Sequence, residues 1–415
     1  MIKSPISYPG GKFKAMPQIM PLIPSNVKDW REPFFGGGSV TMYYLQECLE
    51  GKIANDGKKR VIPETLTVGD LNPEIWSLWE GCKTVPVDAI CEVCRMAIEK
   101  NTYYYPMFDN LDFENVDVLT EFKGNGHYIE YMGTIETLVE TVTRARENAK
   151  AKSIALLKEH FIENAEENID KYMEVVRETR GDIAEIARVL NLTDSATDTI
   201  IASAIAKLGE AVIGEAKEMF SYLKNMECEQ LSMSTRCARQ YLVNKISFSG
   251  MGDAGSVSKD QFMSYNISQS KRILSASSVL QRVTIKNVSF EEIMRLEPQG
   301  TATADEVFIF LDPPYYTQES SGLYGKDGEM HKGFPHQFFI EECLRTNYKY
   351  LITYDDSVYI RRAFRERYLK QFKLTYTMAG QTSSDALAGE EIFIANYDMD
   401  KMLGITDDLE SSFDF

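Results

Sequence analysis

The feature that most constrains the fold is a short apolar run, Val307 to Leu311, that ends abruptly in Asp-Pro-Pro-Tyr-Tyr. Its length and its β-branched and aromatic residues predict a buried central strand. Pro313 and Pro314 lack an amide hydrogen and have a fixed φ, so they end the strand and stiffen the following turn. The sequence therefore predicts a fold built around a buried strand with an acid, Asp312, at its carboxyl end.

Three chemical groups follow this strand directly. The carboxylate of Asp312 and the carbonyl of Pro313 are hydrogen-bond acceptors, and Tyr315 adds a flat ring. In open α/β sheets, ligands bind at the carboxyl ends of the strands. Two acceptors beside a stacking ring suit a planar ligand that carries an exocyclic amine. For Asp-Pro-Pro alone, the alternative is a tight turn without a function, and the other motifs of the chain weigh against it.

Length and composition indicate an ordinary globular protein of one large or two smaller domains. The chain has 415 residues, 44% hydrophobic and 26% charged. No stretch approaches the roughly 18 apolar residues of a membrane span, and residues 1–14 lack the apolar core of a signal sequence. Only Cys91 and Cys94 lie close together, which is a weak zinc signal. We expect a cytoplasmic protein with no metal site and no membrane association.

Both ends of the chain have the pattern of an α/β fold. Candidate strands lie at 29–35, 65–70, 283–288, 307–311, 350–354, 374–378 and 391–396. Helical patterns at 39–49 and 336–346 lie between some of them. Strands that alternate with helices predict a largely parallel sheet covered on both faces.

Residues 81–240 differ from both ends. Apolar residues recur at helical spacing, and helices are expected at 135–163, 169–180, 182–190 and 198–226. This segment carries 18 basic and 28 acidic residues, a net charge of −10, whereas residues 241–300 carry 7 and 5, a net charge of +2. The sequence predicts a large helical insertion within one sheet domain. Its acidic character suggests a site for a protein partner or for self-association.

Three weaker motifs accompany the Asp-Pro-Pro turn. The segment 31–39, Arg-Glu-Pro-Phe-Phe-Gly-Gly-Gly-Ser, joins a strand to a helix, and its glycines would let the backbone approach a ligand closely. Asp70 ends the second candidate strand, where a carboxylate typically accepts hydrogen bonds from ribose hydroxyls. The N-terminal segment 8–12, Tyr-Pro-Gly-Gly-Lys, offers an aromatic ring and a cation. Each motif alone is also compatible with an ordinary turn.

In this order, the four motifs resemble the DNA adenine-N6 methyltransferases of the Dam-like (D12) class. Segments 241–251, 351–357 and 389–397 are similar to further conserved stretches of that class, so the resemblance covers roughly residues 1–80 and 236–398. It implies an α/β, Rossmann-like sheet that uses S-adenosylmethionine and acts on double-stranded DNA. We expect a catalytic domain at 1–80 and 276–398, the helical insertion at 81–240, a DNA-recognition segment at 241–275 and an acidic tail at 399–415.

The resemblance implies roles for three sets of residues. The catalytic set is Asp312, Pro313, Pro314 and Tyr315. The cofactor-binding set is Tyr8, Gly10, Gly11, Lys12, Glu32, Pro33, Phe34, Phe35, Gly36, Gly38, Ser39, Asp70, Asn72, Asn287, Ser289 and Asp312. The nucleic-acid-binding set is Asn244, Lys245, Ser249, Lys259, Asn266, Lys271 and Arg272.

One position departs from the family. An acid often ends the third strand there, near the adenine of the cofactor, but residues 286–289 of this chain read Lys-Asn-Val-Ser. Asn287 or Ser289 is expected to take its place. The recognition segment also contains few cations, so its phosphate contacts are expected to be few.

Two other functions compete with an adenine-N6 methyltransferase. A cytosine-N4 methyltransferase would use the same acceptors, although such enzymes more often have Ser-Pro-Pro-Tyr, so Asp312 favours adenine. A partner-dependent or regulatory subunit of a defence complex would keep the fold and act through its acidic insertion. In the favoured mechanism, a flipped adenine donates its amino hydrogens to Asp312 and the Pro313 carbonyl and stacks on Tyr315.

Overall fold

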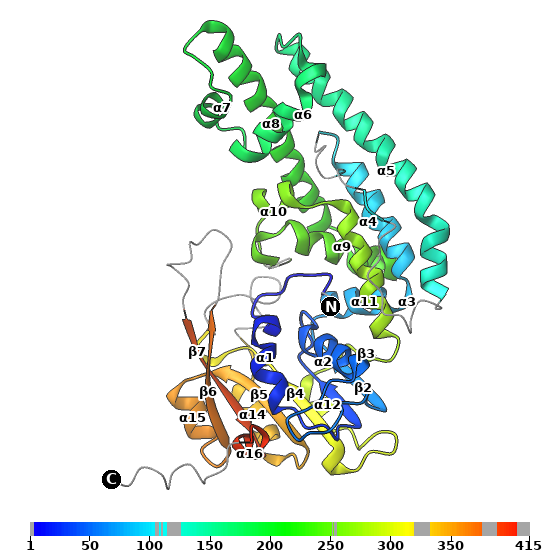
Figure 1. Ribbon diagram of the computed structural model, residues 1–415, viewed down its shortest axis with the longest axis vertical. Helices are drawn as coiled ribbons and strands as arrows, with labels where there is room; N and C mark the ends of the chain where they lie inside the picture. The colour runs from blue at the N-terminus through cyan, green and yellow to red at the C-terminus, as the bar shows by residue number, and fades with distance from the viewer. Residues whose placement is uncertain are drawn as a thin grey trace. The chain divides into compact units, whose positions relative to one another are not determined.

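The protein is described by a computed structural model (Figure 1). The structure describes residues 4–103, 108, 111–113, 126–250, 252, 255–318, 333–375 and 388–404, without the side chains of 128, 249, 318, 373–375 and 388–390. The chain divides into two compact units. The first comprises Met1–Glu80 and Val279–Phe415, and the second comprises Gly81–Ser278.

Among the described residues of the first unit, seven strands form one sheet in the order β3-β2-β1-β4-β5-β7-β6. The strands are β1 (Asp29–Glu32), β2 (Thr65–Gly69), β3 (Thr284–Lys286), β4 (Val307–Leu311), β5 (Lys349–Asp355), β6 (Tyr368–Thr375) and β7 (Ala388–Ala395). The first five run parallel, and β7 lies antiparallel between β5 and β6. The predicted α/β fold with a mainly parallel sheet is therefore confirmed.

Strand β4 lies at the centre of the sheet, and all five of its residues are buried, as its unbroken apolar run predicted. Its residues alternate between two helical layers. Ile309 and Leu311 share a core with α12 (Phe290–Met294), α14 (His336–Arg345) and α15 (Val358–Ala363). Phe308 instead stacks on Trp30, which stacks in turn on Tyr44 of α2 (Ser39–Glu50). Helices thus cover both faces of the sheet.

Six of the seven predicted strands match observed ones within a few residues, and the exception is β6. The prediction at 374–378 meets β6 only at 374 and 375, and residues 376–378 lie outside the described residues. Charged residues such as Lys370 interrupt the apolar pattern of this strand. Within the described part of the sheet, β6 pairs only with β7 and is an edge strand, and such strands tolerate charged side chains.

The described part of the second unit consists of helices. They are α4 (Pro86–Lys100), α5 (Gly126–Glu159), α6 (Ala165–Thr179), α7 (Ile183–Val189), α8 (Ala196–Lys224), α9 (Met233–Ile246) and α10 (Lys259–Ser264). Helix α3 (Pro73–Thr84) enters this unit from the first, and α11 (Arg272–Leu280) leaves it. The long helices α5 and α8 contact each other and α6 (Figure 1). Residues 81–240 and 241–275 thus fall within one compact unit.

The first residues of the acidic tail form a short helix, α16 (Met399–Met402). Its Asp400 pairs with Lys370 of β6 at 2.7 Å. Residues 405–415 lie outside the described part of the chain.

Candidate functional site

Asp312 is fixed at the carboxyl end of β4 by two donors from distant parts of the sequence. The Lys12 ammonium lies 2.8 Å from Asp312 Oδ1, and the Thr353 hydroxyl donates to the same oxygen at 2.7 Å. Lys12 is 3% exposed and also donates to the Gly10 carbonyl, whereas the Asp312 side chain is 22% exposed. Both donors therefore hold the same oxygen of the carboxylate, Oδ1.

The Tyr315 ring is held beside this carboxylate. Its hydroxyl donates to Glu391 Oε2 at 2.6 Å, its ring stacks on Tyr354 with centroids 6.0 Å apart, and the Lys12 ammonium lies 5.1 Å from its centroid. The structure therefore brings together Lys12, Asp312 and Tyr315, which sequence analysis had placed in two separate motifs. Pro313 is buried and Pro314 is half-buried between the acid and the ring.

The glycine loop after β1 is tightly enclosed by aromatic rings. Gly36 and Gly38 adopt the left-handed φ values of 43° and 65°. A Cβ atom on Gly36 would lie 2.8 Å from the ring of Tyr8, and one on Gly38 would lie 2.8 Å from Trp79 and 2.9 Å from Phe35. The indole of Trp79 donates to the Gly36 carbonyl at 2.8 Å. Only glycine fits at these two positions.

Asp70 links this loop to the end of β2. Its Oδ2 accepts the Gly36 amide hydrogen and its Oδ1 accepts that of Asn72, both at 2.9 Å. The Asn287 amide donates to the carbonyls of Asp70 and Leu71 at 2.8 and 3.0 Å. Asn287 thus meets Asp70 at the same edge of the sheet.

The other predicted cofactor residues take supporting positions. Glu32 is buried and accepts hydrogen bonds from the amide and hydroxyl of Thr41, near the start of α2. Phe34 packs against Phe290 in the core on the α12 side, and Ser289 bonds to Glu292 at 3.1 Å. The remaining members occupy the loop and the N-terminal turn. They are Pro33 and Ser39, which flank the glycine loop, and Gly11, whose amide donates to the Tyr8 carbonyl at 3.0 Å.

Three carboxyl groups near this edge of the sheet, the buried Glu32 and Glu391 and the half-buried Asp70, have raised pKa values. Burial raises the pKa of Glu32 to about 8, that of Asp70 to about 6 and that of Glu391 to about 7. Hydrogen bonds from Thr41 oppose the shift at Glu32, and Lys12 and Tyr315 oppose it at Glu391. All three groups therefore bind protons more tightly in the folded chain than in the unfolded chain.

The free energy of unfolding should fall as the pH rises from 5 to 7. In this window the folded state holds more protons at these carboxyl groups, and each full proton of difference lowers stability by about 1.4 kcal/mol per pH unit. The Glu32→Gln variant keeps an acceptor for Thr41 and cannot titrate. Its slope, measured by urea denaturation at several pH values, should be shallower by up to that amount.

The matched control is Glu342→Gln in α14. Glu342 is also buried, but hydrogen bonding to Arg295 lowers its pKa, so its titration lies below pH 5. That variant should lose stability and keep the wild-type slope between pH 5 and 7. A Glu32→Gln variant with the wild-type slope would contradict the assignment of a protonated Glu32.

The predicted nucleic-acid-binding residues all lie in the second unit. Asn244 of α9 is buried and donates to the Gly250 carbonyl at 2.9 Å, and Asn266 caps the 3-10 turn Ile267–Lys271. Lys271 pairs with Asp112 at 2.8 Å. Burial and the charge of Arg272 lower the pKa of Lys245 to about 7. Lys259 is exposed at the start of α10, and the side chain of Ser249 lies outside the described residues.

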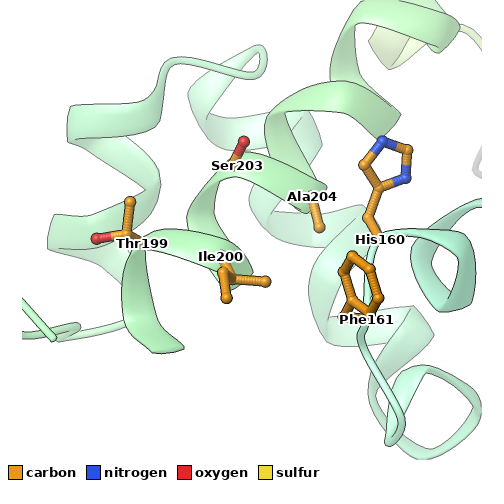
Figure 2. Close-up of a pocket in the computed structure, with 6 residues that line it drawn as sticks. All are labelled: His160, Phe161, Thr199, Ile200, Ser203 and Ala204. Atoms are coloured by element: carbon orange, nitrogen blue, oxygen red, sulfur yellow. The ribbon is translucent and has the colours of Figure 1, made fainter. Parts of the chain in front are cut away.

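A separate surface pocket of about 280 Å³ lies in the second unit (Figure 2). Its lining residues are His160, Phe161, Thr199, Ile200, Ser203 and Ala204. None of the residues predicted from the sequence lines it, so it is not part of the candidate site.

Within the described ranges, no group of three or more His, Cys, Asp or Glu side chains could hold a metal ion. No helix of this part of the chain has both the length and the hydropathy to span a membrane.

Three residues at the site were not predicted from the sequence. Thr353 and Asp355 lie on β5, and Glu391 lies on β7, at the end of its pairing with β5. Asp355 accepts the Tyr316 amide hydrogen at 2.7 Å, and it is the register partner of Glu391. A signal was present, because an acid within an otherwise apolar strand, as in Glu-Ile-Phe-Ile at 391–394, indicates a buried polar group with a specific partner.

Comparison with known proteins gives two matches. A family model described as D12 class N6 adenine-specific DNA methyltransferase matches residues 8–197 and 181–378. Over 39 residues, or 9% of this chain, the sequence is 49% identical to the modification methylase StsI of Streptococcus sanguinis. That stretch spans 6% of the length of StsI. Because the family model covers most of the chain, the protein belongs to the D12 class of N6 adenine-specific DNA methyltransferases.

Proposed function

We propose that the protein transfers a methyl group from S-adenosylmethionine to N6 of an adenine flipped out of double-stranded DNA. The observation that carries this proposal is the fixed carboxylate of Asp312. Lys12 and Thr353 both hold its Oδ1, beside the ring of Tyr315. This arrangement leaves Oδ2 to accept a hydrogen bond from an exocyclic amine, and the family match supports DNA adenine as the substrate.

The residues at the ends of β1 and β2 fit the proposed cofactor. Each oxygen of Asp70 accepts one backbone amide, and a carboxylate oxygen can accept a second hydrogen bond, so Asp70 could also bind ribose hydroxyls. The adjacent loop has a left-handed backbone at Gly36 and Gly38, where the rings of Tyr8, Trp79 and Phe35 occupy the space of a side chain and fix the path of the loop beside Asp70. Asp70, Asn72, Asn287 and the glycine loop would hold S-adenosylmethionine, which supplies an electrophilic methyl group when bound.

The remaining steps follow from the acceptors at the end of β4. The lone pair of an adenine amino group is delocalised into the ring, which makes the nitrogen a poor nucleophile. Hydrogen bonds to Asp312 Oδ2 and to the Pro313 carbonyl would draw the nitrogen toward tetrahedral geometry and localise that lone pair. The nitrogen would then attack the methyl carbon as the carbon–sulfur bond breaks, so that the sulfur leaves as the neutral thioether S-adenosylhomocysteine. The nitrogen would afterwards release one of its protons to solvent, with Asp312 Oδ2 as the proposed first acceptor. The protein contributes positioning and electrostatic stabilisation, without a covalent intermediate.

Access to the amine requires that the base leave the helix, which costs a few kcal/mol. Stacking of a base on an aromatic ring contributes about 1–3 kcal/mol, so contact with Tyr315 would offset part of that cost. The second unit would supply the DNA contacts. The proposed phosphate ligands are the exposed Lys259, Lys271 at the end of the 3-10 turn Ile267–Lys271, and Arg272 at the start of α11.

The test is incorporation of a labelled methyl group from S-adenosylmethionine into unmethylated duplex DNA. We expect incorporation that saturates with time, because each recognition site accepts a limited number of methyl groups. A sample already methylated with unlabelled cofactor should accept no label. No transfer to duplex DNA, despite measurable cofactor binding, would overturn the proposal.

A further inference from the structure

A buried carboxylate outside the four sequence motifs contacts the Tyr315 ring. Glu391 is 1% exposed, and its Oε2 accepts the Tyr315 hydroxyl at 2.6 Å. Among the described residues, its Oε1 has no hydrogen-bond partner. Burying a carboxylate costs free energy unless its contacts compensate for the lost water. A carboxylate kept buried against the Tyr315 hydroxyl therefore indicates a specific role for this contact.

The reversed direction of β7 explains how Glu391 reaches the site. Parallel strands β4 and β5 both end at the same edge of the sheet, at Asp312 and Asp355. Because β7 is antiparallel to β5, it begins at that edge, with Glu391 paired in register with Asp355. The antiparallel strand β7 therefore places the Glu391 carboxylate at the same edge of the sheet as Asp312, which follows β4.

The charged groups around Glu391 come from several elements. Lys12 lies on the N-terminal turn and favours the ionised form, whereas Asp312 after β4 and Asp355 on β5 oppose it. The Tyr315 hydroxyl donates to Glu391 and also favours the ionised form. Burial prevails over these contacts and raises the pKa of Glu391 to about 7. In either protonation state, an oxygen of Glu391 can accept the hydroxyl hydrogen.

The contacts of Tyr315 fix its ring at more than one point. Glu391 holds the hydroxyl end, Tyr354 stacks with the ring at an interplanar angle of 25°, and the preceding Pro313 and Pro314 restrict the backbone. Of these contacts, only that from Glu391 is a hydrogen bond to the phenol oxygen. Removing it would take away the contact that orients the hydroxyl end of the ring.

We propose that Glu391 is a positioning residue that holds the Tyr315 ring in the orientation against which the target base stacks. This inference rests on the proposed function, because the orientation of the Tyr315 ring affects the reaction only if adenine stacks on it. Glu391 itself need not touch the substrate. Replacing Glu391 should lower the rate of methyl transfer only because its hydrogen bond to the Tyr315 hydroxyl is lost.

A double-mutant cycle tests this assignment. Glu391→Leu removes the acceptor, Glu391→Gln retains an acceptor oxygen, and Tyr315→Phe removes only the hydroxyl. We expect kcat to fall about tenfold for Glu391→Leu and for Tyr315→Phe, and less for Glu391→Gln, which would act as a partial rescue. The double variant Glu391→Leu, Tyr315→Phe should be no slower than either single variant, since both changes remove the same contact.

The control separates positioning from stability. Glu342→Gln removes a buried carboxylate that bonds Arg295 and Arg345, away from the reacting groups. It should lower the melting temperature and leave kcat unchanged, and the Kd of S-adenosylmethionine should stay within about twofold for all variants. Losses in kcat that multiply in the double variant would overturn the assignment, as would an unchanged kcat in Glu391→Leu. A wild-type protein without transfer activity would instead refute the proposed function.

Discussion

Replacing Asp312 with alanine should reduce methyl transfer by at least about 10²-fold, while S-adenosylmethionine binding persists. The carboxylate is the acceptor that activates the amine, and loss of one preorganised electrostatic contact of this kind typically costs about 10²–10³-fold in rate. Loss of Asp312 also removes one ion pair of the buried Lys12, so some loss of stability is expected as well. Single-turnover kinetics and calorimetric titration of the cofactor measure the two effects separately.

Two further variants sharpen this result. Asp312→Asn keeps the size of the side chain and one acceptor oxygen, so its fold should resemble the wild type and its activity should still fall strongly. Asp305→Ala removes an exposed aspartate immediately before the amino end of β4, in the turn Ala304–Glu306, and should leave the rate unchanged. Retention of wild-type activity by Asp312→Ala would show that the end of β4 has no catalytic role, as a purely regulatory subunit would require.

Replacing Gly38 with alanine should destabilise the protein by about 2–5 kcal/mol and weaken cofactor binding by at least about tenfold. A left-handed φ costs an alanine about 1–2 kcal/mol, and overpacking adds about 1–3 kcal/mol. The overpacking arises because the new Cβ would lie 2.8 Å from Trp79 and 2.9 Å from Phe35, both buried. Denaturation and cofactor titration measure the two effects.

Gly57→Ala is the matched control for backbone strain. Gly57 has a φ of 76°, and a Cβ there would meet nothing within 4 Å. The variant should lose only the free energy that a left-handed φ costs an alanine, about 1–2 kcal/mol. It should bind the cofactor as the wild type does. Equal losses of stability in the two variants would show that the rings of Trp79 and Phe35 do not constrain the loop.

The central part of the fold could be predicted because its signals are local. An unbroken apolar run ended by two prolines predicted β4 with its exact bounds, and therefore the position of Asp312. The helices α2 and α14 also began at the predicted residues, Ser39 and His336. Buried strands and amphipathic helices have patterns of apolar residues that can be recognised within a short stretch of the sequence.

Contacts between distant segments could not be predicted in the same way. The ion pair of Lys12 with Asp312 depends on the path of the whole intervening chain, and each residue was foreseen only in its own motif. The bond from Tyr315 to Glu391 depends on the reversed insertion of β7 between β5 and β6. Alternation of side chains in a sequence does not specify which strand becomes the neighbour of another.

The identity of the methylated nucleoside tests the central claim most directly. Duplex DNA lacking modified bases would be treated with the protein and S-adenosylmethionine, digested to nucleosides and separated by chromatography with mass detection. We expect N6-methyladenine in the treated DNA, and none after treatment with Asp312→Ala. N4-methylcytosine in its place, or no methylated nucleoside at all, would contradict an adenine-N6 methyltransferase built around Asp312.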